Sequence, residues 1–239
     1  MVKSVTVVNN STCYRHRKWL SALGMRVLVI AFFALFAADA TAQRHEDTDK
    51  LGRALEYFQS AKYHEALLLF DYLDRNYTLN PRFRAYMALC YYYEWDYQKA
   101  VDYFAKSLPE LEGLAPHERS VYYFAAAESC FNLGKYEEST IYYNKVLQVC
   151  YPQEQADVYY KLGFCHLTVG QWAEAKQDFE SSLQIYRSLG VAEDKQARLP
   201  QLERMIAGCE AELRKKELME KEQQKETATE AETPKVSQE

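Results

Sequence analysis

The sequence predicts an all-α protein in which four helical hairpins stack into an α-α superhelix and a C-terminal helix caps the array. Three observations predict this class. Glycine (8) and proline (6) are scarce among 239 residues, which argues against an all-β chain with many tight turns. Tyrosine is abundant at 20 residues, which favours many half-buried helix faces over one small core. The third observation is a short pattern that recurs four times along the chain.

Residues 1–42 are predicted to be a signal peptide. Val27 to Ala38 form a run of 12 apolar residues directly after Arg26, and the segment ends in Ala40-Thr41-Ala42, a small-x-small cleavage pattern. The run is shorter than the ~20 residues that span a bilayer. One alternative is an uncleaved signal that anchors the protein. Another is that residues 1–24 are an over-extended start, because Met25-Arg26 alone makes a compact signal start.

The charge is divided unevenly between this leader and the body. Residues 1–42 carry five bases and one acid, a net charge of +4. Because the whole chain carries −5, residues 43–239 carry −9. An acidic body lacks the positive surface that binding to a phosphate backbone needs, so no nucleic-acid partner is expected.

Four five-residue segments of the body share an aromatic second residue and a small last residue. They are 62–66, 96–100, 135–139 and 171–175, and their last residues are 34, 39 and 36 apart. Four residues after the last residue of each segment stands an aromatic residue: Phe70, Phe104, Tyr143 and Phe179. Twelve residues before that last residue stands another small residue: Ala54, Ala88, Ala127 and Gly163. A small residue at a helix crossing lets two backbones approach, and an aromatic one turn away fills the remaining gap.

The pattern resembles the tetratricopeptide repeat, a pair of antiparallel helices of about 34 residues. The resemblance covers about residues 47–189 and is best in the fourth unit, around Gly163. Two departures stand out: Lys50 and Arg84 occupy a first-helix position where the later units have tyrosine, and five extra residues lengthen the second unit. The resemblance implies a solenoid with units at about 47–80, 81–119, 120–155 and 156–189.

Local signals predict where the helices begin and turn. First helices are expected to start at Asn80-Pro81, at Ala115-Pro116 and, in the same way, at Tyr151-Pro152, since proline is tolerated in an opening turn. Gly134 and Gly170 are expected in the tight turns between paired helices, with Trp95 in that place in the second unit.

The C-terminal region is predicted to close the array. Apolar residues at helical spacing predict a capping helix within 190–222: Leu199, Leu202, Met205, Ile206, Cys209 and Leu213. Residues 223–239 are rich in Glu, Lys, Gln and Thr and are expected to be a disordered charged tail.

No group of residues predicts catalysis, cofactor binding or a metal site. The histidines of the body are scattered, and His166 stands where other units place a tyrosine, so a structural role is expected for it. Five cysteines remain after the leader, none in a CxxC motif. Buried free thiols are the simplest interpretation, although export would permit disulfides. The protein is therefore not expected to be an enzyme or to have a small-molecule substrate.

The resemblance also implies a peptide-binding groove, because in this family first-helix residues line a concave face. Carried over to this sequence, these are Leu51, Leu55, Phe58, Ala85, Leu89, Tyr92, Phe124, Glu128, Phe131, Asn132, Tyr160, Phe164 and Leu167. The Lys/Asn/Arg clamp with which some members hold a chaperone's C-terminal carboxylate is missing. A hydrophobic or amphipathic helix, or an extended peptide with bulky side chains, fits better. The alternative is a groove filled by tight packing or by the C-terminal helix.

These observations predict an exported, non-enzymatic protein–protein interaction scaffold or assembly adaptor, periplasmic or associated with the cell envelope. The alternative is an accessory subunit of an enzyme complex for envelope biogenesis or secretion. The expected partner is a protein or peptide. Contact with a membrane is expected only through an envelope complex or an uncleaved signal.

Overall fold

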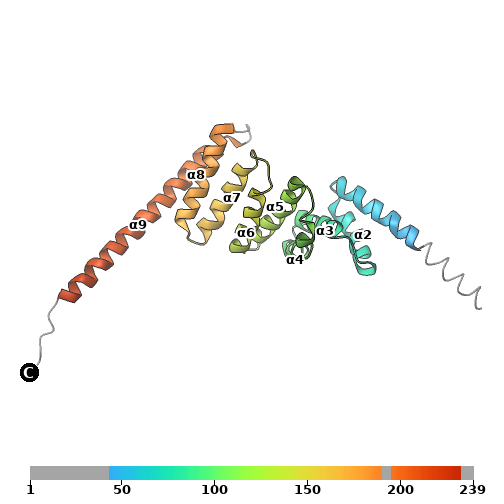
Figure 1. Cartoon of the computed structure of the whole chain (residues 1–239), viewed down its shortest axis with the longest axis horizontal. Helices are drawn as coiled ribbons and strands as arrows, with labels where there is room; N and C mark the ends of the chain where they lie inside the picture. The colour runs from blue at the N-terminus through green and yellow to red at the C-terminus, as the bar shows by residue number, and fades with distance from the viewer. Residues whose placement is uncertain (1–42, 190–194, 233–239) are drawn as a thin grey trace, which may run out of the picture.

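The computed structural model describes residues 43–189 and 195–232, and all regular structure in these ranges is helical (Figure 1). The predicted signal peptide, residues 1–42, lies outside the described residues. A helix over residues 43–59 comes first. It is followed by α2 (Tyr63–Asn76), α3 (Pro81–Tyr93), α4 (Tyr97–Ser107), the 3-10 helix η1 (Leu108–Leu111), α5 (Pro116–Asn132), α6 (Tyr136–Leu147), α7 (Gln155–Thr168), α8 (Trp172–Leu189) and α9 (Arg198–Glu232).

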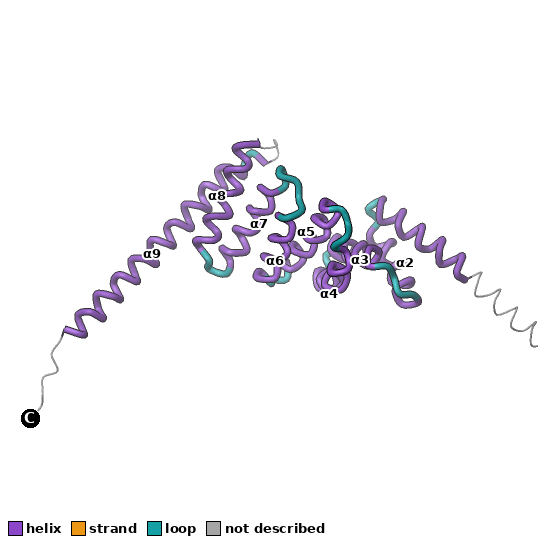
Figure 2. The backbone as a smooth tube through the Cα atoms, in the orientation of Figure 1, coloured by secondary structure: helices purple, strands orange, loops and turns teal. Residues whose placement is uncertain are grey.

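The helices pair into hairpins that stack along one direction. Short turns join α3 to α4, α5 to α6 and α7 to α8, and each second helix also packs against the first helix of the next hairpin. The tube view shows these pairs following one another in an elongated array (Figure 2). The predicted all-α superhelix of four hairpins with a closing helix is confirmed.

The predicted helix crossings form the core. The small residues Ala54, Ala88, Ala127 and Gly163 are all buried, and Phe70, Phe104, Tyr143 and Phe179 are each 0% exposed. At Gly163 the fit is tightest, because a Cβ built there would lie 2.4 Å from Cε1 of Phe179. The spacing of small and aromatic residues therefore predicted the contacts between helices correctly.

The hairpin turns also follow the sequence. Gly134 and Gly170 have positive φ angles of 74° and 76°, and Trp95 occupies the same place with a φ of 64°. Ala61, with a φ of 56°, completes the set in the first hairpin. Left-handed backbone reverses the chain after each first helix, and glycine adopts it at least cost.

Two predicted limits are wrong. Helix α7 begins at Gln155 and not at Pro152, because residues 151–154 close a turn in which the Tyr151 amide donates to the Glu154 carboxylate at 2.9 Å. The predicted boundary between 81–119 and 120–155 cuts through α5, which begins at Pro116. The extra residues of the second unit form η1, where Leu108 and Leu111 are buried.

Helix α9 caps the last hairpin as predicted but is longer than predicted. Leu202 and Cys209 are buried against the α8 side of the array, with Leu199, Met205 and Ile206 packed around them. The helix continues to Glu232, so residues 223–232 are helical where disorder was expected. The cause is that this stretch lacks glycine and proline and is built mainly from good helix formers. Residues 233–239 lie outside the described chain.

Candidate functional site

The inner face of the array is built by the first helix of each hairpin. Helix α3 contacts both its own partner α4 and the next first helix, α5. This contact brings the exposed sides of α3 and α5 together on one face. This is the face on which the family resemblance placed the groove.

The structure distributes the thirteen predicted groove residues over three degrees of exposure. Half-buried are Leu51, Leu55, Phe58, Tyr92, Phe124, Phe131, Tyr160, Phe164 and Leu167; buried are Ala85, Leu89 and Glu128; exposed is Asn132. A half-buried side chain packs against the protein with one part and leaves the other part accessible to a partner. Of the buried members, Ala85 and Leu89 belong to the hydrophobic core, and Glu128 is a buried charged residue.

In the first two hairpins the predicted groove rings pack mainly against other aromatics. Phe58 stacks on Tyr86 with ring centroids 4.8 Å apart, and Tyr92 lies edge-on to Tyr93 at 5.1 Å. Burial, with a smaller contribution from the charge of Glu128, raises the pKa of Tyr92 to about 12. These contacts make this end of the face a packed aromatic layer.

At the other end, the beginning of α9 covers part of the predicted groove. Tyr160 and Phe164 form an edge-to-face pair at 4.9 Å, and Phe164 packs in turn on Phe179 at 5.4 Å. The Arg198 guanidinium lies 4.6 Å from the centroid of the Tyr160 ring. The C-terminal helix thus reaches the groove by its first turn, and the remainder of its first half runs along α8.

Between these two ends lies a hollow of about 400 Å³. Apolar side chains of α5, α6 and α7 line its inner part, namely Val121, Phe124, Val146 and Val158. Polar side chains line the remainder, namely Ser120, Glu154, Asp157, Lys161, Lys195 and Arg198. Phe124 stands edge-on to Tyr143, with ring centroids 5.9 Å apart. Of the predicted groove residues, Phe124 is the one that lines this hollow.

Asp157 organises one side of the hollow. Its carboxylate accepts hydrogen bonds from Lys195, from Arg198 and from the Tyr186 hydroxyl, the last at 2.6 Å. Burial opposes ionisation of Asp157, but the hydrogen bonds from Lys195 and Tyr186 and the nearby positive charges outweigh it and lower the pKa of the carboxyl. The cluster fixes the segment before α9 against α7 and places both cations at the edge of the hollow.

Glu128 holds another lining residue of the hollow, Lys161. This buried carboxylate accepts a hydrogen bond from the Tyr143 hydroxyl and a second, at 2.8 Å, from Lys161. Burial and the charge of Glu128 raise the pKa of Tyr143. Lys161 also lies 5.6 Å from the centroid of the Phe131 ring. A predicted groove residue therefore holds Lys161, one of the two lysines that line the hollow.

Sequence reasoning missed all six polar residues of the hollow: Ser120, Glu154, Asp157, Lys161, Lys195 and Arg198. Asp157 and Lys161 flank Tyr160 one turn apart on α7, and that spacing was a usable local signal. Lys195 and Arg198 had no local signal, because they join Asp157 across 38 and 41 residues of sequence.

His166 and the cysteines, which could in principle take part in catalysis or bind a metal, make structural contacts. His166 lies 2.6 Å from the Asp178 carboxylate, and this hydrogen bond raises the pKa of the imidazole. The five body cysteines are free thiols, and four of them are buried. Among the described residues, no group of His, Cys, Asp or Glu has the arrangement of a metal site. No helix in this part of the chain is long and apolar enough to cross a membrane.

Comparisons with known proteins agree with this architecture. A family model described as "Tetratricopeptide repeat" matches residues 118–188, which span most of α5 to α8. A solved structure of MamA (AMB-1) superposes with a TM-score of 0.57 at 13% identity, covering 81% of this chain and 98% of that one. The apo form of RapI gives a TM-score of 0.53 at 15% identity, covering 71% of this chain and 65% of that one. A search of curated proteins finds no significant match. The fold is therefore that of a tetratricopeptide-type solenoid.

Proposed function

We propose that this chain is an exported, non-enzymatic interaction scaffold of the cell envelope that binds a partner protein through its inner face. The hollow between α5 and α7 is the observation that carries the proposal. It is bounded by consecutive first helices, it is accessible from outside, and its inner part is apolar. A hollow of this kind fits one bulky apolar side chain from a helix or an extended peptide.

The cationic side chains that line the hollow are already paired with carboxylates, which favours an apolar anchor residue over a charged one. Lys161 is paired with Glu128, and Lys195 and Arg198 are paired with Asp157. A charged ligand would have to displace these pairs, whereas an apolar side chain can enter beside Phe124 without breaking them. Buried aromatic contacts commonly supply most of the energy of such an interface. Binding should therefore depend only weakly on ionic strength.

The same pairing supports a scaffold over an enzyme. Asp157, Glu128 and His166 each have a partner at hydrogen-bond distance, and these partners hold helices together. Export is proposed from the sequence of residues 1–42, in which bases and an apolar run precede a small-x-small pattern.

Site-specific photo-crosslinking in the native cell tests the groove. A photoreactive amino acid replaces Val121, which lines the hollow and is 42% exposed. The matched control replaces Ile141, an apolar residue of α6 that lies outside the hollow and is 58% exposed. A discrete adduct with another protein is expected from position 121 and not from position 141. Equal labelling at both positions would contradict a groove on the inner face.

Two further variants separate the groove from the C-terminal end. Phe124→Ala combined with Tyr160→Ala should abolish the adduct at position 121, because the aromatic anchor surface is lost, while circular dichroism shows that helicity persists. Truncation after Lys216 should leave the adduct unchanged. If the truncation abolishes binding and the double variant binds normally, the groove is core packing and the C-terminal end is the binding site.

A further inference from the structure

Among the described residues, one side of helix α9 has no packing partner. Its first half lies along α8, where Leu202 and Cys209 are buried. Its second half runs on past α8 into solvent (Figure 1). In each preceding hairpin from α3 onward, the first helix is covered by a second helix that turns back along it. Helix α9 holds the place of a first helix, yet the chain continues straight through residue 232 instead of turning back.

A hollow of about 720 Å³ lies between α8 and α9 on this uncovered side. Leu183 and Ile206 supply apolar surface to it. Glu180, Glu203 and Glu210 line it as well, against one base, Arg187, so the hollow is acidic. It has the position that the second helix of a further hairpin would take beside α9. An occupant should therefore be a helix that runs antiparallel to α9 and carries bases beside an apolar residue.

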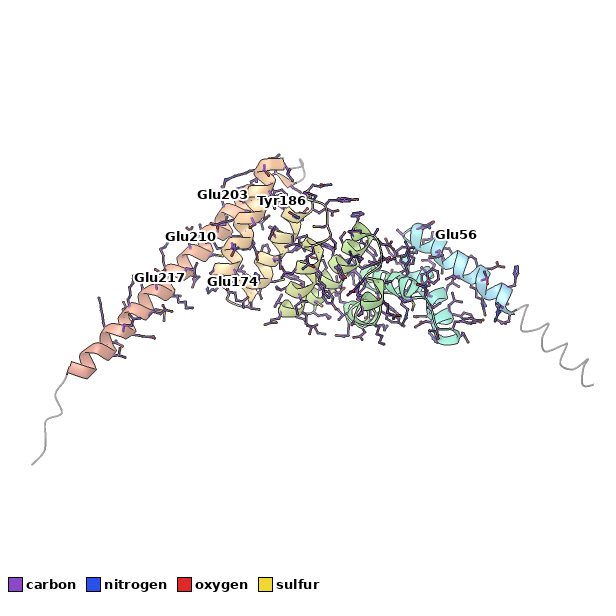
Figure 3. All side chains as sticks on the ribbon, viewed as in Figure 1. Glu56, Glu174, Tyr186, Glu203, Glu210 and Glu217 are labelled. Atoms are coloured by element: carbon purple, nitrogen blue, oxygen red, sulfur yellow. The ribbon has the colours of Figure 1, made fainter. Side chains whose placement is uncertain are left out.

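The second half of α9 has this chemistry. Arg214 and Lys221 are seven residues apart, as are Glu203 and Glu210, and the spacing between the two pairs places all four on one side of the helix. The stick view shows Glu203, Glu210 and Glu217 following one another along α9 (Figure 3). Leu218 lies between the two bases and is 60% exposed. Glu217 also lies on this side, between the two bases. When two copies run antiparallel, Arg214 and Lys221 nevertheless come opposite Glu210 and Glu203.

We infer that two copies of this chain associate antiparallel through α9, with the second half of each helix lying in the hollow between α8 and α9 of the other. In this register Arg214 faces the partner's Glu210, Lys221 faces the partner's Glu203, and Leu218 faces the partner's Ile206. Twofold symmetry makes every one of these contacts twice. The second half of α9 from each copy then covers the open side of α9 in the other.

Existing ion pairs leave room for these contacts. Glu203 bonds to Arg187 at 2.6 Å, and Glu210 bonds to Lys176 at 3.0 Å and lies 4.0 Å from Arg214 of its own helix. The two carboxylates nevertheless remain 53% and 39% exposed. Pairs at that exposure are weak, and a carboxylate with four acceptor positions can take a second cation. The surface is also distinct from the groove between α5 and α7, so the dimer does not depend on the proposed partner-binding function.

Charge reversal tests the antiparallel register. One variant carries Arg214→Glu with Lys221→Glu, and a second carries Glu203→Lys with Glu210→Lys. Either variant alone places like charges opposite each other at every paired position, so sedimentation equilibrium of the purified, natively processed protein should show monomers where the unmodified protein is a dimer. Mixing the two variants restores opposite charges at all four positions, and heterodimers should form.

The mixture also serves as the folding control, because misfolded variants would not associate when mixed. A matched variant, Lys215→Glu with Lys216→Glu, makes the same change of net charge off the proposed contact side and should remain dimeric. Truncation after Lys216, which removes Leu218 and Lys221, should give a monomer. The inference is overturned if the unmodified protein is monomeric, if the reversed variants dimerise as it does, or if their mixture stays monomeric.

Discussion

At the scale of single residues, the fourth hairpin differs from the others in how closely its helices approach. Ala54, Ala88 and Ala127 fill the equivalent crossing positions in the first three hairpins and are fully or almost fully buried. At Gly163 a methyl group would overlap the Phe179 ring, with its nearest atom 2.4 Å away. Both Gly163 and Phe179 are buried between α7 and its neighbours, so neither can move without repacking the hairpin.

Gly163→Ala is therefore expected to lower the free energy of unfolding by about 1–3 kcal/mol, the usual cost of overpacking a core. This loss should outweigh the better helix propensity of alanine, which favours the change by ~1 kcal/mol. Gly208→Ala in α9 is the matched control, because no atom lies within 4 Å of its added Cβ, and it should be neutral or stabilising. Urea denaturation of both variants gives the comparison. A stabilised Gly163→Ala variant would contradict the tight crossing.

The residues of the hollow were harder to predict from the sequence than the residues of the core. Small and aromatic residues recur within each unit, so their spacing carries the packing information. Phe124 was identified as a groove residue by its place in that pattern. Asp157 of α7 meets Lys195, which precedes α9, and Arg198, the first residue of α9, and this cluster recurs in no other unit. Repetition predicts what every hairpin shares and gives no signal for a cluster that occurs once.

At the scale of elements, the four hairpin turns share one backbone conformation but not one residue type. Gly134 and Gly170 adopt positive φ without steric cost, whereas Trp95 adopts it at 64° with a large side chain. The Trp95 side chain is 78% exposed, so little packing compensates for the strain. A non-glycine residue in this region costs about 1–2 kcal/mol.

Trp95→Gly is accordingly expected to raise the free energy of unfolding by up to about 1 kcal/mol, with part of the relief lost to the greater freedom of glycine in the unfolded chain. Leu133→Gly is the control, since Leu133 stands beside Gly134 in the corresponding turn with an ordinary φ of −85°. That change relieves no strain and should destabilise. Thermal unfolding measures both. If Trp95→Gly destabilises the protein as Leu133→Gly does, the tryptophan ring contributes packing that outweighs the strain.

Element limits were predictable where a single residue determines them. Asn80 and Pro81 begin α3 as expected, since the Asn80 side chain accepts a hydrogen bond from the Arg82 amide at 2.9 Å. Pro152 does not begin α7, because Glu154 closes a turn with Tyr151 first. The end of α9 was missed for a different reason. Its charged composition is compatible with disorder and with helix alike, and packing of its first half on α8 favours helix.

At the scale of the whole molecule, a solenoid separates its surfaces. Each hairpin contacts its neighbours along the chain, so the inner face and the uncovered side of α9 are formed by different elements. The groove lies between α5 and α7, while the hollow proposed for self-association lies between α8 and α9. A dimer through α9 would present two grooves on one assembly and increase the avidity for a partner with repeated sites.

The last prediction concerns the whole chain and its processing. The net charge is +4 over residues 1–42 and −9 over the rest, and the apolar run from Val27 to Ala38 stands immediately after Arg26. Bases before a short apolar segment are typical of export signals, and the Ala40-Thr41-Ala42 pattern suits cleavage after residue 42. We expect the native protein to begin at Gln43, and mass spectrometry of its N-terminal peptide measures this. Cleavage there would release the acidic solenoid from the membrane. A native protein that retains Val27 to Ala38 would instead be held at the membrane by that segment, with its inner face available to membrane-bound partners.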